Sequence, residues 1–198
     1  MAASLKYWLQ YEVPVSVMPF ISAAHSATIP NTDTTGQKYD FVYVASGEAH
    51  KNHRNLLEAW RLLADEGLKP SLALTIDPES YPFLANEISR HKQEYGLNIV
   101  NLGHVPAADI PAFYQSSSAL IFPSQVESFG LPLIEATQLG LPVLAPELDY
   151  VRDVIQPAET FDPNSPVSIA RAVRRFLDNA EPIIQLHSAE EFLAELFK

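Results

Sequence analysis

The chain contains, between Phe122 and Ala145, the sequence FPSQVESFGLPLIEATQLGLPVLA. The apolar residues at its two ends predict strands, and the segment between them predicts a helix that begins at Pro132 and ends before Gly140. Proline suits the first turn of a helix because its fixed φ angle matches the helical value and its missing N–H group would have no partner there. Residues 129–131 therefore place backbone N–H groups at a helix N-terminus, which attracts phosphate and sugar oxygens.

Two glutamates, Glu127 and Glu135, flank this helix start with seven residues between them. A carboxylate accepts two hydrogen bonds at once and so suits the vicinal hydroxyls of a ribose, and hydrogen bonds to charged groups contribute about 1.5–3 kcal/mol each. The combination suits a nucleoside-diphosphate sugar, which is anionic in the middle and rich in hydroxyls at both ends. Two purely structural explanations stay open: the helix dipole could favour Glu135, and Glu127 could cap the helix.

Short apolar segments alternate with helical patterns on both sides of this stretch. We expect strands at 41–45, 72–76, 98–102, 119–122 and 142–144, an edge strand near 154–161, and helices at 56–63, 81–95, 110–115, 132–139 and 165–177. The alternation predicts an α/β fold, namely a doubly wound, Rossmann-like, mostly parallel sheet with helices on both faces. Gly47, Gly103 and Glu127 each follow a predicted strand, so we expect their loops to meet at the ligand-binding edge of the sheet.

The same alternation divides the chain into three parts. Residues 1–38 read as a lead-in or inter-domain linker. Residues 39–180 form the predicted nucleotide-sugar-binding domain. Residues 181–198 are expected to form a C-terminal helix, with a capping box from Ser188 to Glu191.

The composition is that of an acidic globular protein, with 47% hydrophobic residues and a formal net charge of −11. A chain this acidic lacks the basic face that nucleic acids require, and it does not suit docking on anionic lipid by itself. The absence of cysteine excludes disulfides and fits a reducing cytoplasm. Neither a long apolar run nor a signal-peptide core occurs, so we expect a cytoplasmic protein without direct membrane insertion.

Several familiar site signatures do not occur in the sequence. There is no Asp-x-Asp, no Gly-x-Ser-x-Gly, no P-loop and no Gly-x-Gly-x-x-Gly. His50 and His53 have a spacing that could serve a metal, but no third ligand lies near them in the sequence. We therefore expect no metal site.

At residues 122–145 the chain resembles the donor-binding half of family 4 (group 1) retaining glycosyltransferases, which have the GT-B fold. Their signature is Pro-Ser-x-x-Glu-Gly-Phe-Gly-Leu-Pro-x-x-Glu-Ala followed by Gly-x-Pro-Val, and the chain departs from it only at Ser128, where the family usually has glycine. The resemblance extends from Tyr39 to Asp178. It implies the C-terminal half of a GT-B enzyme that binds a GDP- or UDP-sugar and transfers the sugar with retention of configuration, without a metal or other cofactor.

The resemblance also implies roles for individual residues. Glu127 would lie near the transferred sugar and Lys51 would contact the diphosphate, and these two are the expected catalytic residues. Glu135 would hold the ribose. The other expected donor-binding residues are Ser128, Phe129, Gly130 and Leu131 before the helix, Ser46 where the family often has an arginine, and His104 and Val105 beside the nucleobase. Two alternatives stay open: Lys51 could be an ordinary solvated lysine, and residues 103–106 could be a simple turn.

The resemblance finally implies partners beyond the donor. A glycan or lipid-linked acceptor would bind through an N-terminal domain that these residues do not include. We therefore expect the isolated chain to bind donor but to transfer little sugar, and we expect the full-length enzyme to be peripheral at the inner membrane. Two other functions stay open, a non-catalytic nucleotide-sugar-binding module and half of a GT-B nucleotide-sugar epimerase.

Overall fold

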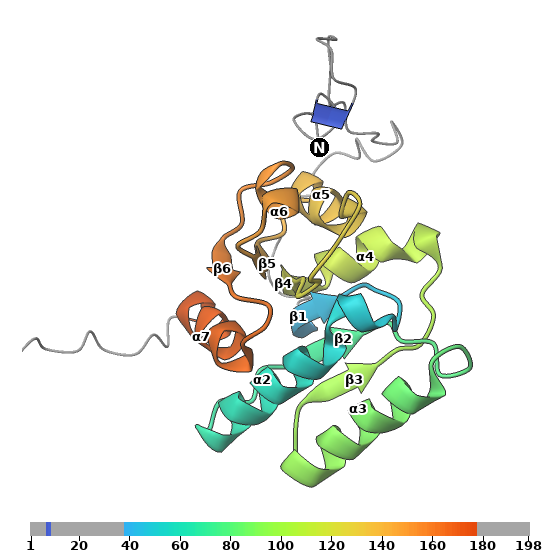
Figure 1. Cartoon of the computed structure of the whole chain (residues 1–198). Helices are drawn as coiled ribbons and strands as arrows, with labels where there is room; N and C mark the ends of the chain where they lie inside the picture. Colours follow the sequence, from blue (N-terminus) through green and yellow to red (C-terminus); the bar gives the residue numbers. More distant parts are fainter. Residues whose placement is uncertain (1–6, 9–37, 178–198) are drawn as a thin grey trace, which may run out of the picture.

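The computed structural model describes residues 7–8 and 38–177 of the 198-residue chain (Figure 1). The expected lead-in at residues 1–38 lies almost entirely outside these described residues. The expected C-terminal helix at residues 181–198 lies outside them altogether. The structure can therefore be compared with the prediction for the central domain, residues 39–180.

Six parallel strands form one sheet in the order β3-β2-β1-β4-β5-β6. The strands are β1 (Tyr39–Tyr43), β2 (Leu72–Leu74), β3 (Ile99–Asn101), β4 (Ser117–Ile121), β5 (Val143–Pro146) and β6 (Glu159–Phe161). Phe41 of β1 lies opposite Leu72 on one side and opposite Ala119 on the other. This strand order confirms the predicted doubly wound, Rossmann-like α/β fold.

Helices cover both faces of the sheet (Figure 1). They are η3 (Ala49–Lys51), α2 (His53–Asp65), α3 (Pro82–Tyr95), η4 (Ala107–Asp109), α4 (Ile110–Gln115), α5 (Leu131–Gln138), α6 (Asp149–Arg152) and α7 (Pro166–Phe176). Helix α2 packs against α3 and α7 on one face, whereas α4 packs against α5 on the other. The chain changes face between β3 and β4, so the order of the strands reverses between β1 and β4, which is where doubly wound sheets bind their ligands. None of the described helices has the length and hydropathy of a membrane-spanning helix.

The core beneath β1 is built from aromatic rings. Phe41 is fully buried and makes edge-to-face contacts with Trp60 of α2 and Phe176 of α7, both at 5.6 Å between ring centroids. The buried indole N–H of Trp60 donates to the carbonyl of Pro70 at 2.9 Å, so its polar atom is satisfied. This packing anchors β1 and α2, and it thereby fixes the two ends of the loop that joins them.

The ends of several elements differ from the prediction by one or two residues. Strand β2 ends at Leu74 because the backbone of Ile76 bonds to the side chain of Asn101 instead of to a neighbouring strand. Asn101 Oδ1 accepts from the Ile76 amide at 2.9 Å, and Nδ2 donates to the Ile76 carbonyl at 2.8 Å. The predicted cap of α7 is confirmed, since the Ser165 side chain accepts from the Ser168 amide at 3.2 Å.

Candidate functional site

The loop after β1 and the loop after β4 are held side by side at the carboxyl edge of the sheet. The hydroxyl of Tyr43 donates to the carbonyl of Lys51 at 2.8 Å and lies 3.1 Å from Ser124 Oγ. The amide of Gln125 donates to the carbonyl of His50 at 2.9 Å. Tyr43 is fully buried, so these contacts fix both loops against the core.

Asn52, the N-cap of α2, joins a third loop to these two. Its Nδ2 atom donates to the carbonyl of Pro123 at 3.0 Å and to the carbonyl of Pro163 at 2.7 Å, and the residue is only 7% exposed. Its backbone is left-handed, with φ of 64°, a conformation that asparagine adopts more readily than most residues. A single buried amide therefore connects segments that follow β1, β4 and β6.

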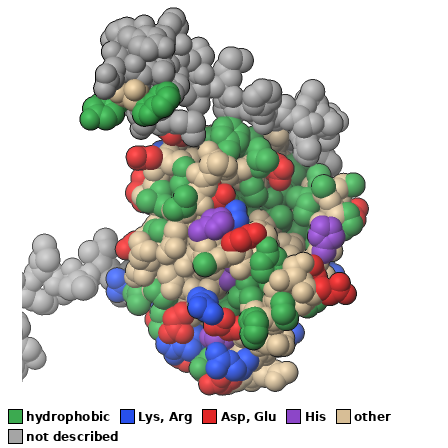
Figure 2. Space-filling model, turned by 45° about the vertical axis from the view of Figure 1, so that its right-hand side comes forward, with side chains coloured by type: hydrophobic (Ala, Val, Ile, Leu, Met, Phe, Trp, Pro, Cys, Tyr) green, Lys and Arg blue, Asp and Glu red, His purple; other side chains and the backbone are tan. Residues whose placement is uncertain are grey.

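These contacts bring the two expected catalytic residues together. Lys51 Nζ lies 2.7 Å from Glu127 Oε1, and the side chains are only 17% and 11% exposed. The Glu127 carboxylate is thus paired with Lys51 and does not cap α5, whose N-cap is Gly130, so the capping explanation is wrong. Burial, and secondly the charge of Glu127, raises the pKa of the nearby Tyr150 hydroxyl. Figure 2 shows basic, acidic and histidine side chains close together on one face of the molecule.

Helix α5 starts with an open N-terminus. Gly130, its N-cap, has φ of 71°, and a Cβ atom placed there would lie 3.0 Å from Leu133 Cδ1. No side chain caps this helix. None of the hydrogen bonds among the described residues uses the amides of Ser128, Phe129, Gly130 or Leu131. The helix therefore presents unpaired N–H groups and the positive end of its dipole beside the ion pair.

Glu135 lies one turn inside α5 and is half-buried. Its Oε2 atom accepts a long hydrogen bond of 3.4 Å from the hydroxyl of Tyr114, a fully buried residue of α4. Burial, and secondly the charge of Glu135, raises the pKa of this hydroxyl, so Tyr114 remains a neutral donor. The other carboxylate oxygen and the remaining lone pairs of Glu135 can accept hydrogen bonds from a ligand.

The remaining expected residues line a pocket of about 320 Å³ at the ends of β1, β2 and β3, which includes Ser46, His104 and Val105. Ser46 donates a short hydrogen bond to the carboxylate of Glu48, and the hydroxyl of Tyr81 donates to the same carboxylate at 2.7 Å. These two hydrogen bonds lower the pKa of Glu48 to about 2, and the bond from Ser46 has the larger effect. The carboxylate therefore stays ionised next to the position where the family often carries an arginine.

The structure thus arranges the expected residues in two neighbouring groups. Lys51, Glu127 and residues 128–131 form one group at the start of α5, with Glu135 one turn further along. Ser46, His104 and Val105 form the other group, around the smaller pocket. The loop after β1 carries both Ser46 and Lys51, so it links the groups. Within residues 7–8 and 38–177, no cluster of histidine and acidic side chains is suited to hold a metal ion.

Sequence reasoning missed four residues of this region. Tyr43 and Tyr114 lie in apolar segments and read as core, although their hydroxyls bond to Lys51 and Glu135. Glu48 and Tyr81 are 33 residues apart, and no pattern in the sequence connects them. One usable signal was present in the sequence. Tyr43 ends an otherwise apolar strand directly before the candidate loop, and a buried hydroxyl needs a hydrogen-bond partner.

Residues 27–189 match the model of the family described as glycosyl transferases group 1. The serotype-specific mannosyltransferase WbdA of Escherichia coli is 31% identical over 179 residues, which are 88% of this chain and 21% of WbdA. The O-antigen chain mannosyltransferase B of Escherichia coli is 28% identical over 142 residues, 70% of this chain and 36% of that protein. The chain thus spans between a fifth and about a third of the length of these relatives.

Solved structures share the fold at low sequence identity. Anabaena HepE in complex with UDP and glucose has a TM-score of 0.61 at 17% identity, covering 80% of this chain and 44% of HepE. The C-terminal domain of a glycosyl transferase group 1 family protein from Francisella tularensis has a TM-score of 0.60 at 19% identity, covering 74% of this chain and 79% of that structure. The fold is therefore that of one half of a GT-B glycosyltransferase. Because the family match covers most of the chain, this protein belongs to the glycosyl transferases of group 1.

Proposed function

We propose that the chain is the donor-binding domain of a retaining, metal-independent glycosyltransferase, which transfers a sugar from a nucleoside-diphosphate sugar to a polysaccharide or lipid-linked acceptor. The observation that supports this most directly is the pairing of Lys51 with Glu127 at 2.7 Å, beside the open N-terminus of α5. A cation, unpaired amides and a carboxylate then lie together at the ligand-binding edge of the sheet. These are the groups that a diphosphate joined to a sugar requires.

Different parts of the donor would contact the two groups of residues, one at the start of α5 and the other around the smaller pocket. Its diphosphate takes the place of Glu127 as the partner of Lys51 and lies against the amides of residues 129–131. Glu127, released from Lys51, accepts hydrogen bonds from hydroxyls of the transferred sugar. Glu135 accepts from the ribose hydroxyls while Tyr114 holds its carboxylate in place, and the nucleobase lies in the pocket lined by Val105 and its neighbours.

In this arrangement the protein assists the reaction chiefly by stabilising the leaving group. As the bond between the sugar and the diphosphate breaks, negative charge grows on the phosphate oxygens. Lys51 and the N-terminus of α5 are positioned to stabilise that charge without reorganisation. Tyr43 and Asn52 fix the backbone of the loops that carry Lys51 and lead into α5, so these loops are in place before the donor binds, and only the Lys51 side chain has to exchange Glu127 for the diphosphate.

A mannosyl donor is the first candidate substrate, because WbdA and the O-antigen chain mannosyltransferase B are both named as mannosyltransferases. We expect the acceptor to be a glycan, held largely by parts of the enzyme outside the described residues. The non-catalytic alternative differs only in turnover, since the same donor contacts would serve a binding module.

The proposal is tested by titrating the chain with GDP, UDP, GDP-mannose and UDP-glucose and following its amide resonances by NMR. We expect one base to bind, and we expect Glu135→Ala to weaken that binding about tenfold or more, because hydrogen bonds to a charged group are lost. Glu94→Ala, an exposed change at the far end of α3, is the matched control. Addition of EDTA should leave the affinity unchanged. No binding of any of the four compounds to the unaltered chain would contradict the proposal.

A further inference from the structure

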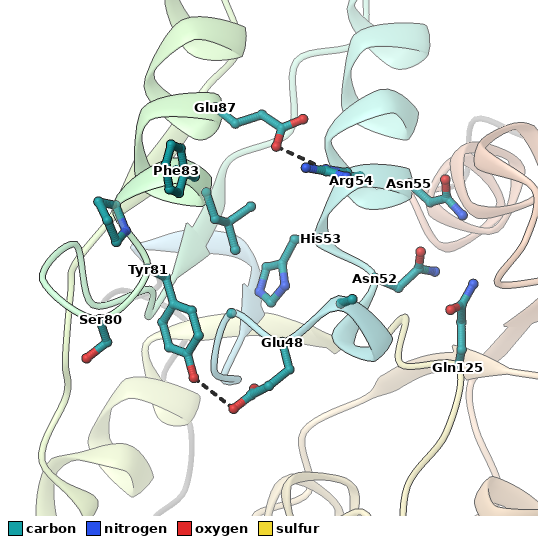
Figure 3. A pocket seen from close by; sticks show the side chains of 14 residues that line it. Glu48, Asn52, His53, Arg54, Asn55, Ser80, Tyr81, Phe83, Glu87 and Gln125 are labelled. Atoms are coloured by element: carbon teal, nitrogen blue, oxygen red, sulfur yellow. Dashed lines mark hydrogen bonds and ion pairs between the residues drawn. The ribbon is translucent and has the colours of Figure 1, made fainter.

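A second and larger pocket, of about 510 Å³, adjoins the one assigned to the nucleobase. It lies between the loop after β1 and the first turns of α2 and α3, and its volume falls within the range of small-molecule sites. Ser80 and Tyr81 line both pockets, so the two are neighbours. Figure 3 shows the hydrogen bond between Tyr81 and Glu48 at one end of the larger pocket and the ion pair between Arg54 and Glu87 at the other.

His53 occupies the centre of this pocket wall, between Tyr81 and Asn52 (Figure 3). It is only 4% exposed, and its ring lies 4.8 Å from that of Tyr43. Neither ring nitrogen has a hydrogen-bond partner among the described residues, which is unusual for buried polar atoms. Burial lowers the pKa of His53 to about 4, so near pH 7 the ring is neutral and offers one N–H donor and one acceptor nitrogen.

The charged side chains of the pocket already have partners. Glu48 accepts hydrogen bonds from Ser46 and Tyr81, and Glu87 pairs with Arg54 at 3.2 Å. The lining contains two carboxylates and one guanidinium, so it has no excess of positive charge for a phosphate. Because both carboxylates have partners, the pocket does not favour a cation either.

The rest of the lining is neutral, polar and partly aromatic. Asn55 and Gln125 donate through their side-chain nitrogens to Pro163 and Asn164, both at 2.9 Å, which turns the amide oxygens into available acceptors. Phe83 is 89% exposed, and its ring stands at the same pocket. Neutral donors and acceptors beside an exposed ring suit a ligand that is uncharged, rich in hydroxyls and apolar on one face.

We propose that this pocket is a second binding site, separate from the donor site, which holds a short neutral segment of a glycan. One sugar ring would stack on Phe83, and hydroxyls of a neighbouring ring would bond to the amide oxygens of Asn55 and Gln125 on the opposite side of the pocket. The buried ring of His53 lies in the wall between these two sides. The site does not depend on the proposed donor function, because none of the residues that would bind the sugar is assigned to the donor.

The experiment follows the amide and histidine-ring resonances of the chain during titration with methyl α-mannoside and a mannose disaccharide, without nucleotide. We expect millimolar binding that shifts the resonances of His53, Asn55 and Gln125. Phe83→Ala should weaken it about fivefold to tenfold through loss of the stacking face. Because Phe83 is exposed, this variant should fold normally, and Val167→Ala, an exposed apolar change on α7, is the control.

Four results would overturn the proposal. Saturating saccharide could leave these resonances unmoved. Inorganic phosphate could shift them while saccharides do not, which would make the pocket an anion site at the start of α3. GDP or UDP could compete with the saccharide, or GDP-mannose could shift the pocket where GDP does not, and either result would place the sugar in the donor site. Retention of saccharide binding in a chain that binds no nucleotide would support the second site while contradicting the donor function.

Discussion

The ion pair between Lys51 and Glu127 predicts opposite changes in nucleotide affinity when one or the other residue is substituted. In the ligand-free protein they neutralise each other at 2.7 Å, so a diphosphate that binds here must compete with a carboxylate for the lysine. The lysine is the attractive partner of the diphosphate, whereas the carboxylate is its competitor. Substitutions at the two positions should therefore move nucleotide affinity in opposite directions.

We predict that Lys51→Met weakens the binding of a bare nucleoside diphosphate by about tenfold or more, because a hydrogen-bonded cation is lost. We predict that Glu127→Gln strengthens it severalfold, because the lysine is released and a negative charge is removed while the size of the side chain is kept. Isothermal titration with GDP and UDP measures both. Weaker nucleotide binding by Glu127→Gln would show that the ion pair organises the site instead of competing for it.

His53 makes stability depend on pH in a defined direction. Burial lowers its pKa in the folded protein from 6.5 to about 4; the charge of Glu48 opposes this shift to a smaller extent, and the charge of Lys51 adds to it. Between these two values the unfolded chain binds a proton that the folded protein does not. The contribution to stability is complete above the unfolded pKa and is lost as the pH falls toward the folded one, by about 3 kcal/mol over the whole interval.

The measurement is urea unfolding of the chain and of His53→Leu at several pH values in this interval. Both proteins lose stability in acid through their carboxylates, so the difference between the two curves isolates the histidine. We expect the free energy of unfolding of the unaltered chain to fall more steeply with decreasing pH. Parallel curves would mean that a water or an ion already satisfies the charged ring.

At the scale of elements, the start of α5 is controlled by one glycine. Gly130 and Gly140 share the same φ of 71°, but a Cβ atom at Gly130 would lie 3.0 Å from the fully buried Leu133, whereas one at Gly140 would meet no atom within 4 Å. A left-handed backbone costs an L-residue about 1–2 kcal/mol. The two positions therefore separate backbone strain from crowding.

We predict that Gly140→Ala lowers the free energy of unfolding by about 1 kcal/mol and leaves nucleotide affinity intact. Gly130→Ala should cost more, about 2 kcal/mol, and should also weaken nucleotide binding, because the amides beside it must move with the displaced helix start. Urea unfolding and nucleotide titration of the two variants form the comparison. Equal effects of both variants on affinity would argue against a ligand at the α5 N-terminus.

The strands and the longer helices could be predicted from the sequence, whereas the short helices η3, η4 and α6 and the contacts between the loops could not. Apolar alternation located every strand, and Ser165 with Pro166 located the start of α7. The end of β2 could not be read because it depends on the side chain of Asn101. The Lys51–Glu127 pair could not be read either, since it requires Tyr43 and Asn52 to join loops far apart in the sequence. A family signature names site residues without giving the partners that each one has before the ligand arrives.

At the scale of the whole molecule, we predict that the isolated chain binds nucleotide sugar but transfers very little. The reason is length: the two relatives are roughly two and four times as long as this chain, so most of each relative has no counterpart here. Incubation of the purified chain with GDP-mannose and mannose disaccharides, followed by chromatography of the products, measures transfer. Sustained turnover would show that this domain carries its own acceptor site.

The amide of Asn52 bonds to carbonyl groups 71 and 111 residues further along the chain. During synthesis on the ribosome, the first strand and its helix leave the exit tunnel long before either partner exists. Until Pro163 has emerged, the Asn52 amide lacks one of its two carbonyl partners, and the loop after β1 is only partly fixed. Domains fold largely as units as they are synthesised, so the nascent protein acquires its binding edge late and in a single step, and truncated products that stop before this proline should carry the motif without the site.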